Sequence, residues 1–75
     1  MYQIILENMG RMQMVTNKYY ADILGITEPY VSNVTTGKLP VKETIAKGMI
    51  SIAYNITLDD KDMNELLERH FTKVK

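Results

Sequence analysis

The stretch from Thr16 to Lys38 reads TNKYYADILGITEPYVSNVTTGK, and it decides the fold of the chain. Thr16 and Thr27 each stand where a helix can begin, because a threonine hydroxyl accepts a hydrogen bond from a first-turn amide that lacks an intrahelical partner. Gly25 lies between them and adopts the positive φ that ends a helix at little cost. The stretch therefore predicts two short helices around a tight turn.

Apolar residues within both predicted helices recur at spacings of three and four, which is typical of helices that pack on one face. They are Tyr20, Ile23, Leu24, Val31 and Val34.

The second helix has further signals at both of its ends. Glu28 suits the positive end of the helix dipole, and Pro29 is tolerated because first-turn amides have no intrahelical acceptor. Gly37 is expected to end the helix. Two helices of this kind form a helix-turn-helix, whose second helix can enter the major groove of DNA.

The same stretch resembles the helix-turn-helix of the Cro and phage-repressor (XRE-type) family. The shared pattern is Thr16, apolar Tyr20, Ala21, Leu24-Gly25-Ile26-Thr27, apolar Val31, Ser32 and Gly37. The alternative is an ordinary helical hairpin with good caps, but several spaced matches favour the family. The resemblance implies an all-α, compact, lambda-repressor-like domain of four to five helices, with the motif at residues 16–37.

The remaining sequence supplies the other expected helices. A first amphipathic helix is predicted from residues spaced at three and four in the segment 2–12, and a third from Val41 or Lys42 to Tyr54. Asn55 is expected to take the left-handed position after it. A last helix is predicted over residues 58–72, with Thr57 and Asp60 approximating a capping box.

Composition limits the class of protein. Seventy-five residues make one domain, 1–75, and 45% hydrophobic residues indicate a globular one. The chain has no cysteine and no long apolar run, so we expect a cytoplasmic protein without a membrane span. The formal net charge is zero, whereas DNA-binding domains are usually basic, so weak monomeric binding is expected.

Catalytic and metal chemistry are not expected. His70 is the only histidine, and the sequence offers no metal-ligand cluster, catalytic triad or phosphate loop. A histidine on an apolar stripe is more often packed than a ligand. Asp59, Asp60 and Asp62 are better interpreted as partners of a helix dipole than as a calcium site, because the EF-hand glycine and glutamate are missing. We therefore predict no enzyme, no metal and no cofactor.

The resemblance implies that four positions of the second helix face base edges: Glu28, Pro29, Ser32 and Asn33. An asparagine can pair with adenine, a glutamate can accept from the amino group of cytosine, and a proline can contact a thymine methyl. The alternative for Ser32 and Asn33 is a solvated helix surface.

Phosphate contacts are expected from groups around this helix. They are the backbone amides of Asn17 and Lys18, together with Tyr30, Thr36, Lys38 and Lys42. Tyr30 has a second interpretation, as a ring that simply covers the motif.

The last predicted helix carries more apolar side chains than a small core needs. We therefore expect a homodimer through Met63, Leu67, His70, Phe71 and Val74. The alternative is that Phe71 belongs to the core.

These patterns predict a small Cro-like transcriptional repressor that binds double-stranded DNA at a pseudo-palindromic operator, and its size and resemblance suggest a phage or mobile-element origin. The alternative is a helix-turn-helix scaffold used as a protein-binding module, such as an antirepressor or an inhibitor of a host factor. Zero net charge and Glu28 in the second helix favour that alternative.

Overall fold

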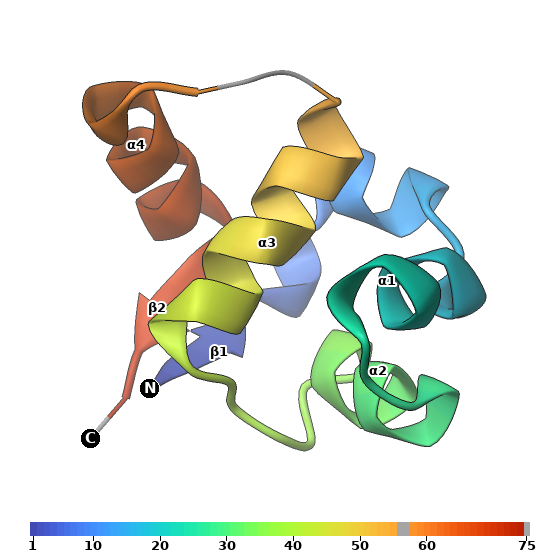
Figure 1. Cartoon of the computed structure of the whole chain (residues 1–75). Helices are drawn as coiled ribbons and strands as arrows, with labels where there is room; N and C mark the ends of the chain where they lie inside the picture. Colours follow the sequence, from blue (N-terminus) through green and yellow to red (C-terminus); the bar gives the residue numbers. More distant parts are fainter. Residues whose placement is uncertain (56–57, 75) are drawn as a thin grey trace.

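The computed structural model describes residues 1–55 and 58–74, and over these residues the chain is mostly helical with one small sheet. Helix α3 lies in the middle, with α1 and α2 on one side and α4 and the sheet on the other (Figure 1). The expectation of an all-α domain is therefore wrong in one respect, the sheet. The elements are β1 (Tyr2–Ile4), α1 (Asn17–Leu24), α2 (Glu28–Thr35), α3 (Glu43–Tyr54), α4 (Asp60–His70) and β2 (Phe71–Lys73).

Helices α1 and α2 begin and end as their sequence predicts. The Thr16 hydroxyl accepts from the Tyr19 amide at 3.1 Å, and the Thr27 hydroxyl accepts from the Tyr30 amide at 3.3 Å. Gly25 follows α1 with φ of 70°. Both threonine caps and the left-handed glycine are thus confirmed, and the two short helices are joined by a tight turn.

The prediction of an N-terminal helix is wrong. Strand β1 pairs antiparallel with β2 on one edge, and on its other edge Tyr2 exchanges two backbone hydrogen bonds of 2.7 Å with Val41. The chain then forms two short 3-10 helices, η1 (Leu6–Asn8) and η2 (Gly10–Met14). Because strand pairing satisfies the backbone of the first residues, a helix has no advantage there.

The C-terminal part also differs from expectation. Helix α4 begins after Asp59, whose carboxylate accepts from the Asp62 amide at 2.8 Å, and it ends at His70 rather than Thr72. The predicted cap Thr57 lies outside the described residues. The chain continues as β2, in which Phe71 stands opposite Ile4, so pairing with β1 replaces the last expected helical turn.

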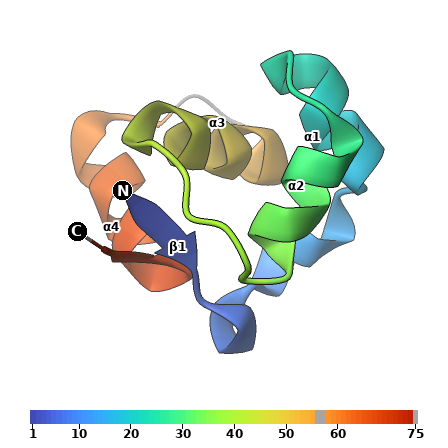
Figure 2. The same ribbon diagram turned by 90° about the horizontal axis from the view of Figure 1, so that it is seen from below.

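Figure 2 shows the start of β1 beside the red segment that leads to the C-terminus, with α3 above both in this view. Helix α3 ends at Tyr54 with Asn55 at φ of 52°, which confirms the predicted left-handed position. None of the helices in the described part of the chain is long and apolar enough to cross a membrane.

Apart from Val41, the buried apolar residues that form the core come from β1, β2, η2 and each of the helices α1 to α4. Ile23 does not belong to it, although its spacing predicted an inward position, because the buried face of α1 is centred on Tyr20 and Ala21. The buried apolar residues are Ile4, Met12, Tyr20, Ala21, Val31, Val34, Val41, Ala46, Met49, Ile50, Ala53, Leu67 and Phe71.

His70 joins three segments inside this structure. Its Nδ1 lies 2.6 Å from the Asn8 carbonyl oxygen, and its Nε2 lies 2.6 Å from the Tyr54 hydroxyl. Since a carbonyl only accepts, Nδ1 donates to the Asn8 carbonyl, and Nε2 shares a hydrogen bond with the Tyr54 hydroxyl. His70 therefore holds η1, α3 and α4 together as a packed histidine.

Candidate functional site

The outward face of α2 carries the four residues predicted to read bases. Glu28, Pro29 and Asn33 are exposed, and Ser32 is half-buried. At 3.6 residues per turn, these four positions fall within an arc of about 140°. The opposite side of α2 is buried through Val31 and Val34. The structure therefore brings the four side chains onto one face.

Helix α2 is held in place from two directions. The Thr35 hydroxyl donates to Asn17 Oδ1 at 3.3 Å, which ties α2 to the start of α1. The Gln3 side-chain amide donates to the Gly37 carbonyl, which ties the end of α2 to β1. The Asn33 carbonyl accepts from the Lys38 amide at 2.9 Å and thereby organises the turn that follows. These contacts leave the outward face unobstructed.

The side chains on that face are available for a ligand. Within residues 1–55 and 58–74, neither the Asn33 side-chain amide nor the Glu28 carboxylate has a hydrogen-bond or ion-pair partner. An amide has two donors and an acceptor, and a carboxylate has only acceptors. The face therefore offers both kinds of hydrogen-bonding group to a planar polar partner.

The candidate phosphate contacts are not equivalent. Lys18, Lys38 and Lys42 are exposed. The hydroxyl of Thr36 already donates to the Ser32 carbonyl at 2.8 Å, so it is less free to bind an anion. The Asn17 side chain is occupied by its bond with α2, but its backbone amide lies in the first turn of α1, where amides have no intrahelical acceptor.

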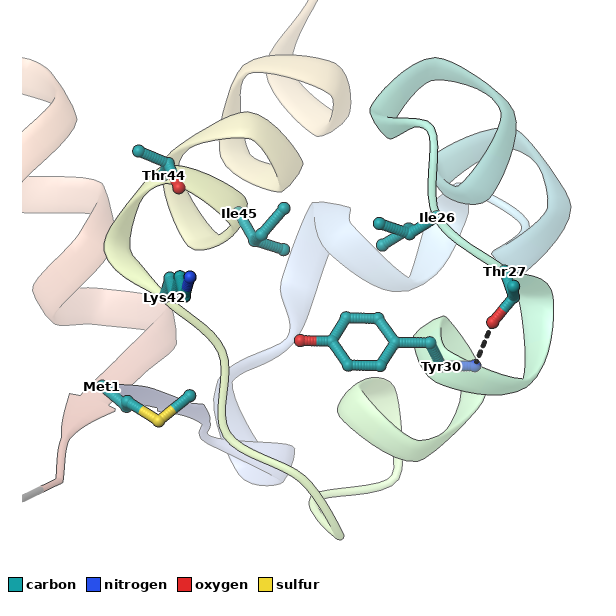
Figure 3. Close-up of a pocket in the computed structure, with 7 residues that line it drawn as sticks. All are labelled: Met1, Ile26, Thr27, Tyr30, Lys42, Thr44 and Ile45. Atoms are coloured by element: carbon teal, nitrogen blue, oxygen red, sulfur yellow. Dashed lines mark hydrogen bonds between the residues drawn. The ribbon is translucent and has the colours of Figure 1, made fainter.

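Tyr30 lies in an open hollow between the start of α2 and the start of α3. The hollow has a volume of about 590 Å³, and Figure 3 shows the Tyr30 ring directed across it toward Lys42, below Ile26 and Ile45. Tyr30 is half-buried in this position. Its placement favours the covering role over a phosphate contact.

The candidate dimer residues lie mostly inside the domain. Leu67, His70 and Phe71 are only 4%, 3% and 2% exposed, and they pack against their own chain. This burial corrects their assignment to a surface between two chains. Met63 and Val74 are half-buried. The excess of apolar residues after position 66 is explained by packing around β1 and β2.

A different apolar surface escaped the sequence argument. Tyr19 and Ile23 on α1 are 53% and 59% exposed, and Met14 just before this helix is 81% exposed. The available signal was the spacing of four between Tyr19 and Ile23, which places them on one strip of a helix, beside rather than on the buried strip.

In the part of the chain that the structure describes, no three His, Cys, Asp or Glu side chains come together in a way that could hold a metal ion. Comparisons of the chain with protein-family models, with curated proteins and with solved structures found no match.

Proposed function

We propose that this chain is a small sequence-specific DNA-binding protein that represses transcription, with α1, the turn and α2 acting as a helix-turn-helix of the Cro type. The observation that carries the proposal is the outward face of α2, on which Glu28, Pro29, Ser32 and Asn33 point away from the core on a short, capped and supported helix. A helix of this width fits the major groove of B-DNA.

Each group on this face has a chemical counterpart on a base edge. The free Asn33 amide can donate to and accept from adenine, and the Glu28 carboxylate can accept from the amino group of cytosine. Pro29 offers an apolar edge to a thymine methyl. Glu28 is also the source of selectivity, since a carboxylate without a cytosine partner is repelled by the phosphates.

A local excess of positive charge around α2 compensates in part for the zero net charge of the chain. Three exposed lysines, Lys18, Lys38 and Lys42, lie within residues 17–42, which contain α1 and α2 and end before α3, against the two carboxylates Asp22 and Glu28. Each phosphate contact makes the dependence of binding on salt steeper, by about 0.9 in the slope of log K against log salt concentration. One chain therefore offers only a few such contacts, and a pseudo-palindromic site occupied by two chains would double them.

Selection from a randomised duplex pool tests base reading. Asn33→Ala should lose roughly 1–3 kcal/mol of discrimination at one position of the selected site, while non-specific affinity stays near wild type. Asn64→Ala, at an exposed asparagine on α4, is the matched control and should change nothing. Unchanged sequence preference in the Asn33 variant would overturn the assignment of α2 to the groove.

A salt series tests the phosphate contacts separately. Lys38→Ala should weaken binding to all sequences alike and reduce the salt slope by about one unit. Lys61→Ala, at an exposed lysine on α4, provides the comparison. If sequence preference changes while the slope stays constant, Lys38 has another role.

A protein-binding module is the second candidate. Zero net charge and the exposed apolar side chains of Tyr19 and Ile23 favour it, because such side chains are typical of protein contacts. A chain that binds no duplex even at low salt would favour this candidate over the repressor.

A further inference from the structure

Helix α1 presents two neighbouring strips of different character to the solvent. One strip is apolar and consists of Tyr19 and Ile23, and the other is charged and consists of Lys18 and Asp22. Residues four apart are adjacent on a helix surface, so each strip is continuous over one turn. The buried side of α1, around Tyr20, lies away from both strips.

The apolar strip is not needed by the domain itself. Both of its side chains are more than half exposed, at 53% and 59%, whereas the core beneath α1 is complete without them. Leaving two large apolar side chains side by side in water forgoes stabilisation of about 25 cal/mol per Å². An exposed apolar strip with charges along its border is typical of a contact surface.

We propose that this face of α1 packs antiparallel against α1 of a second copy of this chain. A two-fold axis midway between positions 19 and 23 places Tyr19 against the partner's Ile23, and Ile23 against the partner's Tyr19. The same axis brings Lys18 opposite the partner's Asp22, and Asp22 opposite the partner's Lys18. The contact is self-complementary, as a two-fold interface requires.

The order of charges on the border selects this occupant and this direction. In an antiparallel pair, the charged strips face each other in reverse order, so both ion pairs form between opposite charges. In a parallel two-fold pair, the charged strips of the two helices lie on opposite sides of the contact and do not face each other, so neither ion pair forms. One short helix covers less than the area of about 800 Å² per partner that standard interfaces bury, so the dimer is weak.

Only one part of this inference rests on the proposed function, namely that the dimer brings two chains together on an operator. The contact uses the side chain of Lys18, whereas the predicted phosphate contact at this residue uses its backbone amide. Self-association is measured on the full chain without DNA, so its failure is distinct from a failure of DNA binding.

Sedimentation equilibrium of the full chain up to about 1 mM tests the dimer. Wild type should be a monomer–dimer mixture, and Ile23→Glu should weaken dimerisation at least tenfold with an unchanged circular dichroism spectrum, because Ile23 is outside the core. Asn64→Glu adds the same charge to an exposed site on α4 and should dimerise like wild type. A monomeric wild type, or an Ile23→Glu variant that dimerises normally, would overturn the proposal.

A charge exchange tests the antiparallel direction on side chains that are exposed in the monomer. Asp22→Lys should weaken the dimer, because it places lysines opposite lysines. The double variant Lys18→Asp with Asp22→Lys should restore the affinity to within a few fold of wild type, because both reciprocal pairs are rebuilt. A double variant that dimerises no better than Asp22→Lys contradicts the proposed pairing.

Discussion

Replacing Tyr20 by phenylalanine removes one oxygen atom from the centre of the core. The Tyr20 hydroxyl donates to the Met12 carbonyl at 2.7 Å, and both residues are 0% exposed. The ring keeps its packing in the variant, but the carbonyl loses its partner. A buried acceptor left without a partner costs about 1–3 kcal/mol, and removal of the buried phenol oxygen offsets part of this, so we expect a loss of about 1–2 kcal/mol.

A loss of this size is measurable in a small domain. A chain of this length has a free energy of unfolding of roughly 4–11 kcal/mol, and each kcal/mol lowers the Tm by about 4–8 °C. Urea unfolding followed by circular dichroism should show a lower midpoint with an unchanged m value. Tyr19→Phe is the matched control, since Tyr19 is 53% exposed, and its effect should stay within about 0.5 kcal/mol.

Alkaline pH provides a second measurement on the same bond. Burial raises the pKa of Tyr20 far above its ordinary value of 10.0, so the folded state keeps the phenol protonated while the unfolded state ionises. Because the folded pKa is raised, this contribution is fully present below pH 10.0 and declines as pH rises further. The stability difference between wild type and Tyr20→Phe should therefore shrink above this pH. Equal stabilities of the Tyr20 and Tyr19 variants at neutral pH would refute the reasoning.

Three further predictions concern the ends of helices. Gly25→Ala should cost about 1 kcal/mol of stability in urea unfolding, because its φ of 70° strains a residue with a side chain. Asn55→Gly should instead gain about 0.5 kcal/mol in the same assay, since the left-handed φ of 52° suits glycine better. The Tyr2 hydroxyl donates to Glu43 at 3.0 Å and, together with Lys47, lowers the pKa of the Glu43 carboxyl. Because the folded pKa is lowered, the stabilising effect of this carboxylate is present above its unfolded pKa and is lost as pH falls through the folded pKa. An NMR titration of the Tyr2→Phe variant should show the pKa of Glu43 raised toward its usual range.

Signals within a few residues of each other predicted the central part of the fold. A threonine before each helix and a glycine after the first specify the bounds of α1 and α2, because cap hydrogen bonds join residues three apart. The direction of the outward face of α2 also follows from local sequence, since Val31 and Val34 define its buried side. The four candidate residues therefore lie on the outward face that the sequence predicts for them, on a helix whose bounds the sequence also predicts.

The sheet could not be predicted in this way. The segment from Tyr2 to Ile4 is too short to show the alternation of apolar and polar residues that is typical of a strand. The apolar residues that follow it recur at the spacings of three and four that are typical of a helix. The partner strand begins at Phe71, where the apolar pattern of α4 continues without interruption. Pairing between segments at opposite ends of the chain is a tertiary effect, and it also buries Phe71, which local pattern assigned to a dimer surface.

We expect the pairing of β1 with β2 to form late as the molecule folds. Contacts between neighbouring segments, such as α1 with α2, close short loops, whereas joining Tyr2 to Lys73 closes nearly the whole chain and costs more chain entropy. Non-local contacts of this kind slow folding and form after the local ones. The Gln3 side chain that holds the Gly37 carbonyl belongs to this last step. Nascent α2 is therefore a loosely anchored element until the two ends of the polypeptide meet, and local opening of the sheet would release the end of α2 long before global unfolding.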